Sequence, residues 1–138
     1  MAKVLIIEDD PIVSRMHQKI FSFEKYSVEA AADGEAGLQK AQSVNPDIII
    51  LDVMLPKMNG LEVLEKLKAD PKTQNIPVLI LTNLSNEKDA QLALQKGAEK
   101  YMLKSESDPK QVVEIANSIL AGKTATKEKP QPGTAPQT

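Results

Sequence analysis

The fold is decided by residues 48–61, which read IIILDVMLPKMNGL. An almost continuous run of Ile and Leu ends on one carboxylate, Asp52, and is followed by a loop that contains Pro56 and Gly60. A short apolar run of this kind is typical of a strand that is buried on both faces, as in the centre of a parallel sheet. Such a strand brings Asp52 to the edge of the sheet, and we interpret Asp52 as a chemical group held there.

Strand and helix patterns alternate along the chain. Short runs rich in Val, Ile and Leu predict five strands, at residues 3–7, 27–31, 47–51, 77–81 and 100–103. Five helical patterns follow these runs, and their predicted capping residues are Asp10, Asp33, Asn59, Asn86 and Asp108. This alternation predicts an α/β fold, a doubly wound five-stranded parallel sheet with five helices on its two faces. In such open sheets, ligands bind outside the carboxyl ends of the strands.

Length and composition exclude several classes of protein. The 138 residues suffice for one domain with a hydrophobic core, and the net charge of −2 comes without a cluster of Lys and Arg, so we expect no direct contact with nucleic acid. The chain has no cysteine, which excludes disulfides, thiolate metal sites and a cysteine nucleophile. It starts without a signal-peptide pattern and has no membrane-spanning apolar run, so we expect a cytoplasmic protein without a membrane partner.

The last part of the sequence differs from the rest. Residues 122–138 read GKTATKEKPQPGTAPQT and include no large apolar residue. Such a segment cannot bury enough apolar surface to offset the entropy lost on ordering. We therefore predict one domain at residues 1–121, followed at residues 122–138 by a disordered tail or a linker.

Polar side chains follow four of the predicted strands. In chain order they are Glu8, Asp9, Asp52, Thr82 and Lys104. Taken singly, each has a plainer explanation, as a solvated loop acid, a turn cap, a strand threonine or a surface lysine. Because the carboxyl ends of parallel strands meet at one edge of the sheet, we expect the five side chains to lie close together.

The chemistry of this group of side chains favours phosphoryl transfer. Three carboxylates in one place either have raised pKa values or require a cation, and hard oxygen ligands suit Mg²⁺. The ammonium of Lys104 can pair with a carboxylate or a phosphoryl oxygen, and Thr82 offers a hydroxyl. Asp52 alone ends a buried central strand, so we predict that Asp52 is the nucleophile that accepts the phosphoryl group.

Four motifs resemble the receiver domain of two-component response regulators, in the same order and at family-like spacing. They are LIIEDDP at 5–11, IIILDVMLPKMNG at 48–60, LILTN at 79–83 and GAEKYMLKS at 97–105. The resemblance covers about residues 3–120. It implies the flavodoxin-like, CheY-like fold of this family, with five parallel strands in the order 2-1-3-4-5.

The resemblance also implies the acceptor and the metal ligands. Asp52 corresponds to the phosphorylated aspartate, and Glu8 and Asp9 to the family's acidic pair. The expected cofactor is Mg²⁺, held within this acidic group by Asp9, Asp52 and the backbone carbonyl of Met54, with Glu8 beside them. The expected phosphodonor is a partner histidine kinase, and the downstream protein effector is not identified by the sequence.

A switch is implied as well. Thr82 and Lys104 are expected to contact the phosphoryl group, and Tyr101 to rotate inward as Thr82 moves. Phosphorylation is then expected to change a surface near residues 86–121 that binds a partner or forms a homodimer, so that the chain is a monomer or a phosphorylation-dependent homodimer. On this interpretation the protein is not an enzyme with an external substrate, although slow self-phosphorylation and dephosphorylation are compatible with the site.

Three features depart from the family pattern. Ser105 follows Lys104 where the family usually has a proline, commonly with a cis peptide bond, which before a non-proline residue costs about 2.5–4 kcal/mol. Asn83 follows Thr82 where many members have a smaller residue. No output domain follows the predicted domain, so the sequence resembles a stand-alone receiver or a fragment.

Alternative functions remain at this point. A phosphatase of the haloacid-dehalogenase type uses the same groups, but its D-x-D motif and cap domain have no counterpart here. A flavodoxin-like cofactor site is disfavoured because the acidic sequence EDDP at 8–11 would repel a phosphate. A receiver that only binds partners is kept open by Ser105. The single histidine, His17, is interpreted as a partly exposed helical residue and not as a phosphodonor.

Overall fold

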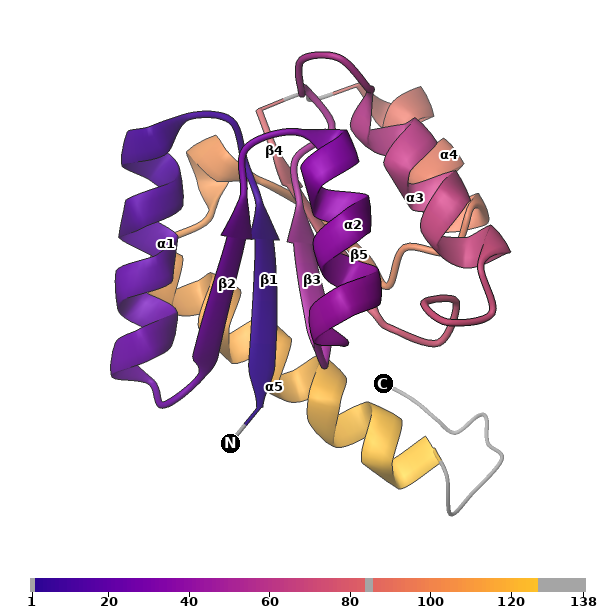
Figure 1. Cartoon of the computed structure of the whole chain (residues 1–138). Helices are drawn as coiled ribbons and strands as arrows, with labels where there is room; N and C mark the ends of the chain where they lie inside the picture. Colours follow the sequence, from indigo (N-terminus) through magenta and orange to yellow (C-terminus); the bar gives the residue numbers. More distant parts are fainter. Residues whose placement is uncertain (1, 84–85, 127–138) are drawn as a thin grey trace.

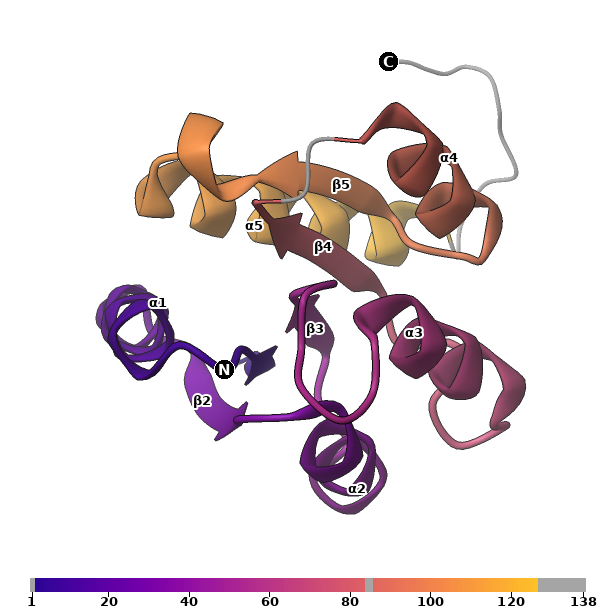
Figure 2. The same ribbon diagram turned by 90° about the horizontal axis from the view of Figure 1, so that it is seen from above.

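The computed structural model describes residues 2–83 and 86–126, without the side chains of residues 123–126. Its centre is one parallel sheet of five strands, and the strand order is β2-β1-β3-β4-β5, as predicted (Figures 1 and 2). The strands are β1 (Lys3–Ile7), β2 (Ser27–Ala31), β3 (Ile48–Leu51), β4 (Val78–Thr82) and β5 (Lys100–Leu103). Their bounds differ by at most one residue from those predicted by the apolar runs.

The helices form a layer on each face of the sheet. They are α1 (Pro11–Phe23), α2 (Gly34–Val44), α3 (Gly60–Ala69), α4 (Glu87–Gln95) and α5 (Pro109–Thr126), with a short 3₁₀ turn, η1 (Lys104–Glu106), between β5 and α5. Helices α1 and α5 cover one face, and α2 and α3 cover the other, with α4 beside β5 (Figure 2). Two hydrophobic clusters fill the space between helices and sheet, one on each face.

The central strands explain why the sheet forms in this order. All four residues of β3 and all five of β4 are buried, which agrees with their nearly uninterrupted apolar sequences. Strand β2 is only half-buried over its first four residues and lies at the edge, as its mixed sequence SVEAA indicates. The sheet therefore places β1 and β3 side by side in its interior, and the carboxyl ends of these two strands carry the acidic residues.

The helix starts follow the predicted capping chemistry. The side chain of Asp10 accepts hydrogen bonds from the backbone N–H groups of Ile12 and Val13, and Pro11 occupies the first helical position. Asp33, Asn59 and Asn86 cap α2, α3 and α4 in the same way. Asp10 is thereby occupied as a cap and does not belong to the acidic group at the sheet edge.

The end of α5 differs from the predicted domain boundary at residue 121. The helix continues to Thr126, so the first residues of the predicted tail are helical. Ala121 and Ala125 favour a helix, and one glycine at position 122 costs only about 1 kcal/mol in a helix interior, which α5 tolerates. The remainder of the predicted tail, residues 127–138, lies outside the described residues. Over the part of the chain that the structure describes, no helix is long and apolar enough to cross a membrane.

Candidate functional site

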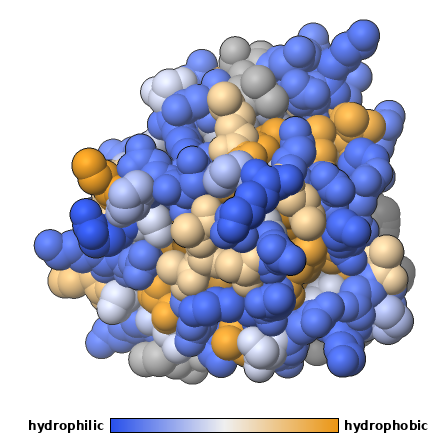
Figure 3. Space-filling model, turned by 45° about the horizontal axis from the view of Figure 1, so that its top comes forward, coloured by the Kyte–Doolittle hydropathy of each residue, from blue (hydrophilic) through white to orange (hydrophobic). Residues whose placement is uncertain are grey.

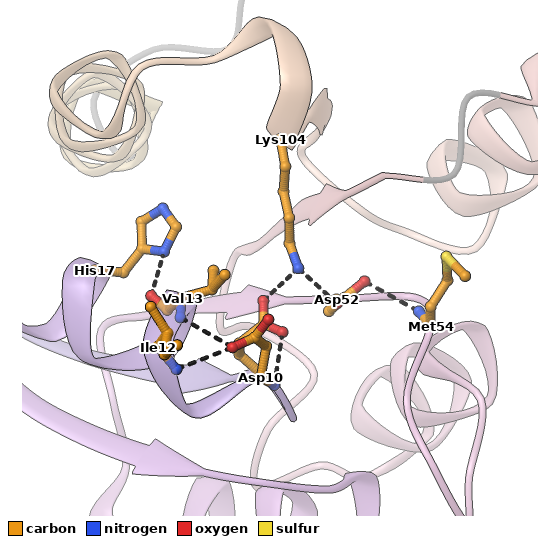
Figure 4. Close-up of polar contacts among 8 residues, drawn as sticks. Asp10, Ile12, Val13, His17, Asp52, Met54 and Lys104 are labelled. Carbon is orange, nitrogen blue, oxygen red and sulfur yellow. Dashed lines mark hydrogen bonds and ion pairs between the residues drawn. The ribbon is translucent and has the colours of Figure 1, made fainter.

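The candidate site lies at the carboxyl edge of the sheet, where the ammonium of Lys104 bridges two buried carboxylates (Figure 4). Its Nζ lies 2.5 Å from Glu8 Oε1 and 2.8 Å from Asp52 Oδ2. The side chains of Glu8 and Asp52 are only 6% and 5% exposed, and that of Lys104 is 15% exposed. Three segments that are far apart in sequence therefore meet in one polar group that is almost closed to water.

Sheet register brings these residues together. Ile7 at the end of β1 is paired with Leu51 at the end of β3, so Glu8 and Asp52 emerge side by side. The backbone N–H of Asp52 still donates to the carbonyl of Ile7, with 3.1 Å between nitrogen and oxygen, which extends the pairing by one residue. The acceptor position is thus fixed by backbone hydrogen bonds and does not depend on a flexible loop.

Asp52 is held from a second side by the loop that follows it. The backbone N–H of Met54 donates to Asp52 Oδ1 over 3.0 Å (Figure 4). The backbone N–H of Gly60 donates to the carbonyl of Val53 over 2.8 Å, which folds the loop back onto the end of β3. Each carboxylate oxygen of Asp52 therefore has a donor, Met54 for Oδ1 and Lys104 for Oδ2. The donor from Met54 was not predicted, because backbone groups leave no signal in the sequence.

Burial and charge act in opposite directions on the ionisable groups. Burial raises the pKa of Glu8, although the hydrogen bonds from Lys104 and from the backbone of Asp10 act to lower it. Burial alone would lower the pKa of Lys104, but its hydrogen bonds to Asp52 and Glu8 outweigh this effect and raise the pKa. Lys104 is therefore held firmly in the charged state, and Glu8 is a carboxyl whose ionisation depends on this lysine.

The three predicted acids form one possible cation site. Carboxylate oxygens of Glu8, Asp9 and Asp52 all lie within 4.8 Å of one another, and Asp9 is the exposed member. When all three are ionised, three negative charges and the one positive charge of Lys104 leave a net charge of −2. Mg²⁺ binds oxygens at about 2.0–2.1 Å in octahedral geometry, so its ligands lie about 3–4 Å apart. The charge and the spacing of the three acids both fit such an ion.

Thr82 lies on β4, the strand next to the one that Asp52 follows, and Tyr101 lies on β5, one strand further out. Thr82 is fully buried at the end of β4 and is paired in register with Leu103, the residue before Lys104. Tyr101 on β5 is half-buried against the hydrophobic cluster on the α2 and α3 side of the sheet. Burial raises the pKa of the Tyr101 hydroxyl, and the charges of Asp89 and Asp52 raise it further.

Two positions that depart from the family pattern, Ser105 and Asn83, can be located in the structure. No peptide bond among the described residues is cis, and Lys104 and Ser105 enter the 3₁₀ turn η1 directly after β5. A serine at position 105 therefore accommodates the turn through an ordinary trans bond. Asn83 is exposed after the end of β4.

The predicted partial exposure of His17 is wrong, although its predicted place within a helix is confirmed. Its side chain is only 4% exposed, because it lies with Ser14 and Phe21 on the stripe of α1 that faces the core. Because this stripe contains polar residues, the apolar periodicity of the helix is weak there, and the sequence therefore suggested that His17 is partly exposed. His17 Nδ1 lies 3.0 Å from the carbonyl oxygen of Val13 and donates to it (Figure 4).

Comparison with known proteins agrees with this geometry. A model of the response regulator receiver domain matches residues 4–117. The chain belongs to the response regulator receiver domain family. The receiver domain resembles that of a CheY-like protein from Methanospirillum hungatei with a TM-score of 0.85 at 27% identity, covering 94% of this chain and 99% of that one. For the chemotaxis protein CheY4 of Vibrio cholerae the TM-score is 0.80 at 30% identity, covering 86% and 98%.

Curated relatives are longer proteins that contain a similar receiver. The DNA-binding dual master transcriptional regulator RpaA of Synechocystis is 39% identical over 75% of this chain and 43% of its own length. The alkaline phosphatase synthesis transcriptional regulatory protein PhoP of Bacillus subtilis is 38% identical over 86% of this chain and 48% of its own length. The matched segment thus spans less than half the length of these relatives, and the receiver belongs to the proteins of two-component signalling.

Proposed function

We propose that Asp52 accepts a phosphoryl group from the phosphohistidine of a sensor histidine kinase, and that this modification switches a partner-binding surface of the chain. The observation that carries the proposal is the position of Asp52, which is buried at the sheet edge beside the ammonium of Lys104 and close to the carboxylates of Glu8 and Asp9. A buried carboxylate with fixed donors on both oxygens is a preorganised nucleophile, because little rearrangement is needed before it reacts.

The transfer exchanges one bond of phosphorus for another. An oxygen of Asp52 forms a bond to phosphorus while the bond between phosphorus and the kinase imidazole nitrogen breaks. The electron pair of that bond returns to the imidazole, which carries its proton on the other nitrogen and leaves as the neutral base. The ammonium of Lys104, which lies 2.8 Å from Asp52 Oδ2, then pairs with the phosphoryl oxygens, and the Thr82 hydroxyl supplies a further donor.

The acidic group supports a requirement for Mg²⁺. Asp9, Asp52 and the Met54 carbonyl would hold the ion directly, with Glu8 beside them. When bound, Mg²⁺ supplies positive charge that stabilises the phosphoryl oxygens. The net charge of the site before binding, −2, explains why a phosphate would be repelled without a cation. Lys104 alone cannot offset three carboxylates.

The output of the switch is expected near residues 86–121. Tyr101 connects the two regions, because it lies on β5 three residues before Lys104 and lines a hollow between α4 and the β5–η1 segment. We infer that phosphorylation at Asp52 changes the packing of Tyr101 and thereby this surface, through binding of a protein partner or dimerisation. Equal dimerisation of the wild type and an Asp52→Ala variant in the presence of a phosphodonor would argue against the dimer. DNA binding, as named for RpaA, belongs to a protein of which the match covers only 43%.

The acceptor is tested by intact-mass spectrometry after incubation with acetyl phosphate. The wild type is expected to gain one phosphoryl group in the presence of Mg²⁺, and Asp52→Asn is expected to gain none. Asp108→Asn is the matched control, because Asp108 lies outside the acidic group and asparagine still accepts the hydrogen bond from Lys110 N–H. A phosphoryl group on Asp52→Asn, or equal labelling of the wild type after removal of Mg²⁺, contradicts the proposal.

The same proteins distinguish the switch from a phosphatase. A phosphatase of the haloacid-dehalogenase type would use an aspartate of the first loop as nucleophile. We expect no sustained hydrolysis of p-nitrophenyl phosphate by the wild type. Hydrolysis that is lost in Asp9→Asn and kept in Asp52→Asn would replace our assignment.

A further inference from the structure

The turn that carries Lys104 is weakly held by its own hydrogen bonds. Among the described residues, no side chain caps η1, and its backbone bond from Ser107 N–H to the Lys104 carbonyl is 3.4 Å long. Hydrogen bonds between nitrogen and oxygen are usually about 2.9–3.0 Å long. The position of Lys104 therefore depends on its ion pairs with Glu8 and Asp52 and on the surroundings of the turn, more than on hydrogen bonds within the turn.

His17 and Lys104 line the same hollow. A hollow between α1 and the start of α5 is lined by His17, Leu81, Lys104, Ser107 and Pro109, together with neighbouring residues of α1 and η1. The His17 ring is buried in its wall. Since a carbonyl oxygen can only accept, the bond to the Val13 carbonyl fixes the proton of the neutral ring on Nδ1 and leaves Nε2 as the basic nitrogen (Figure 4).

The charges around the His17 ring disfavour binding of a second proton at Nε2. Lys104 is the charged group that acts on His17, and the nearby carboxylates of Glu8 and Asp52 are both engaged by that lysine. The other elements packed on α1 turn apolar side chains toward it, namely Val4, Ile6, Val28, Val112, Val113 and Ala116. On α5, Lys110 and Glu114 are exposed, and Glu29 of β2 pairs with Lys40 on the opposite face.

Protonation of His17 is consequently costly at neutral pH. Burial lowers the pKa of His17, and the charge of Lys104 lowers it further, while the bond to Val13 raises it in part. The ring is thus neutral when Lys104 bridges Glu8 and Asp52. A proton on Nε2 would place a second cation against the turn in an apolar hollow.

We propose that His17 is a positioning residue for Lys104: its neutral ring supports the η1 turn with the ammonium at Asp52, and proton uptake at Nε2 displaces the turn and the lysine. The effect on phosphorylation rests on the function proposed above. The effect on Lys104 itself does not, because it concerns only the packing of α1 against η1.

The surface of the molecule is compatible with exchange of this proton with solvent. Figure 3 shows that hydrophilic side chains cover most of the visible face, with hydrophobic residues gathered between them in its middle. The hollow beside His17 opens on α1 at Met16, which is 45% exposed.

The first test uses NMR, and the single histidine of the chain makes the signal unambiguous. We expect His17 to titrate with a midpoint below 6.5, and the side-chain signals of Lys104 to shift with the same midpoint. In Lys104→Met the midpoint should rise, whereas in Lys100→Met, which alters an exposed lysine of the same strand, it should stay. A midpoint at or above 6.5, or Lys104 signals that do not follow it, overturns the proposal.

The second test measures the initial rate of phosphorylation by acetyl phosphate between pH 8 and pH 5. The ratio of the wild-type rate to that of His17→Leu should be constant above pH 7 and fall severalfold below pH 6.5, because leucine fills the site without titrating. His17→Gln, which can still donate to the Val13 carbonyl, should behave like His17→Leu. A ratio that does not change with pH overturns the proposal. If even the wild type accepts no phosphoryl group, the proposed function fails and the NMR titration decides this inference alone.

The dependence of stability on pH gives an independent check on the direction of the pKa shift of His17. A histidine with a lowered pKa in the folded state takes up its proton more readily when unfolded, so the free energy of unfolding falls as the pH drops below 6.5. His17→Leu should lose less stability than the wild type between pH 7 and pH 5. An identical loss in both proteins contradicts a buried neutral ring.

Discussion

Lys104→Met is expected to slow phosphorylation of Asp52 by acetyl phosphate about 100-fold, because one preorganised charge at the developing transition state is worth that factor or more. The same substitution should strengthen Mg²⁺ binding, since it removes the positive charge that bridges two of the three carboxylates. A rate loss combined with tighter metal binding is a signature that general damage to the site cannot produce. The rate is measured by intact mass, and the Mg²⁺ affinity by calorimetry.

Stability should change with the metal concentration in this variant. Without Mg²⁺, Glu8 and Asp52 become buried carboxylates without a cation, which costs about 3 kcal/mol of unfolding free energy at pH 7. Addition of Mg²⁺ should restore more stability to Lys104→Met than to the wild type. Lys100→Met is the matched control, because Lys100 is exposed on the same strand. Equal phosphorylation rates in Lys104→Met and Lys100→Met would show that Lys104 has no role in phosphoryl transfer.

Gly60→Ala is expected to lower the free energy of unfolding by about 3 kcal/mol, near the upper end for overpacking. An added Cβ would overlap the backbone carbonyl oxygen of Asp52 and lie 2.5 Å from Val53 Cα. Neither atom belongs to a flexible side chain, so the end of β3 or the start of α3 must move. Because this shift acts on Asp52 itself, phosphorylation should fall together with stability. Urea unfolding measures the first quantity and intact mass the second.

The control for this substitution is Gly122→Ala. No heavy atom lies within 4 Å of a Cβ added at Gly122, and this glycine lies within α5. Alanine should therefore stabilise the domain by up to about 1 kcal/mol and leave the phosphorylation rate unchanged. If the Gly60→Ala variant is as stable as the wild type, the backbone at Asp52 can shift at little cost in free energy. The description of Asp52 as rigidly held would then be wrong.

The fold was predictable because each of its signals is local. Apolar runs such as residues 48–51 are buried on both faces, which is typical of a central strand. Asp10 followed by Pro11 strongly indicates the start of a helix. The proximity of Glu8, Asp52 and Lys104 could be predicted from the sheet topology, because the carboxyl ends of parallel strands lie at the same edge of the sheet. The resemblance to receiver domains then supplied the strand order, which the structure confirms.

The sequence failed where packing overrides local pattern. His17 is buried although histidine is usually half-exposed, and only the partner elements of α1 decide this. The donor from Met54 N–H to Asp52 is a backbone group and leaves no trace in the sequence. The extent of α5 was underestimated because a polar, proline-containing segment beyond Thr126 dominated the composition of the predicted tail.

The pairing of β1 between β2 and β3 has a consequence for how the protein acquires its activity. Strand β1 is the first strand of the described residues and is an inner one, and its second neighbour, β3, follows some forty residues later in the chain. The lysine arrives only with residue 104, so the contact between Asp52 and Lys104 spans 52 residues of chain. High contact order of this kind slows folding. Competence to take up a phosphoryl group during refolding should consequently mark the last stage of chain assembly, after the helices have formed.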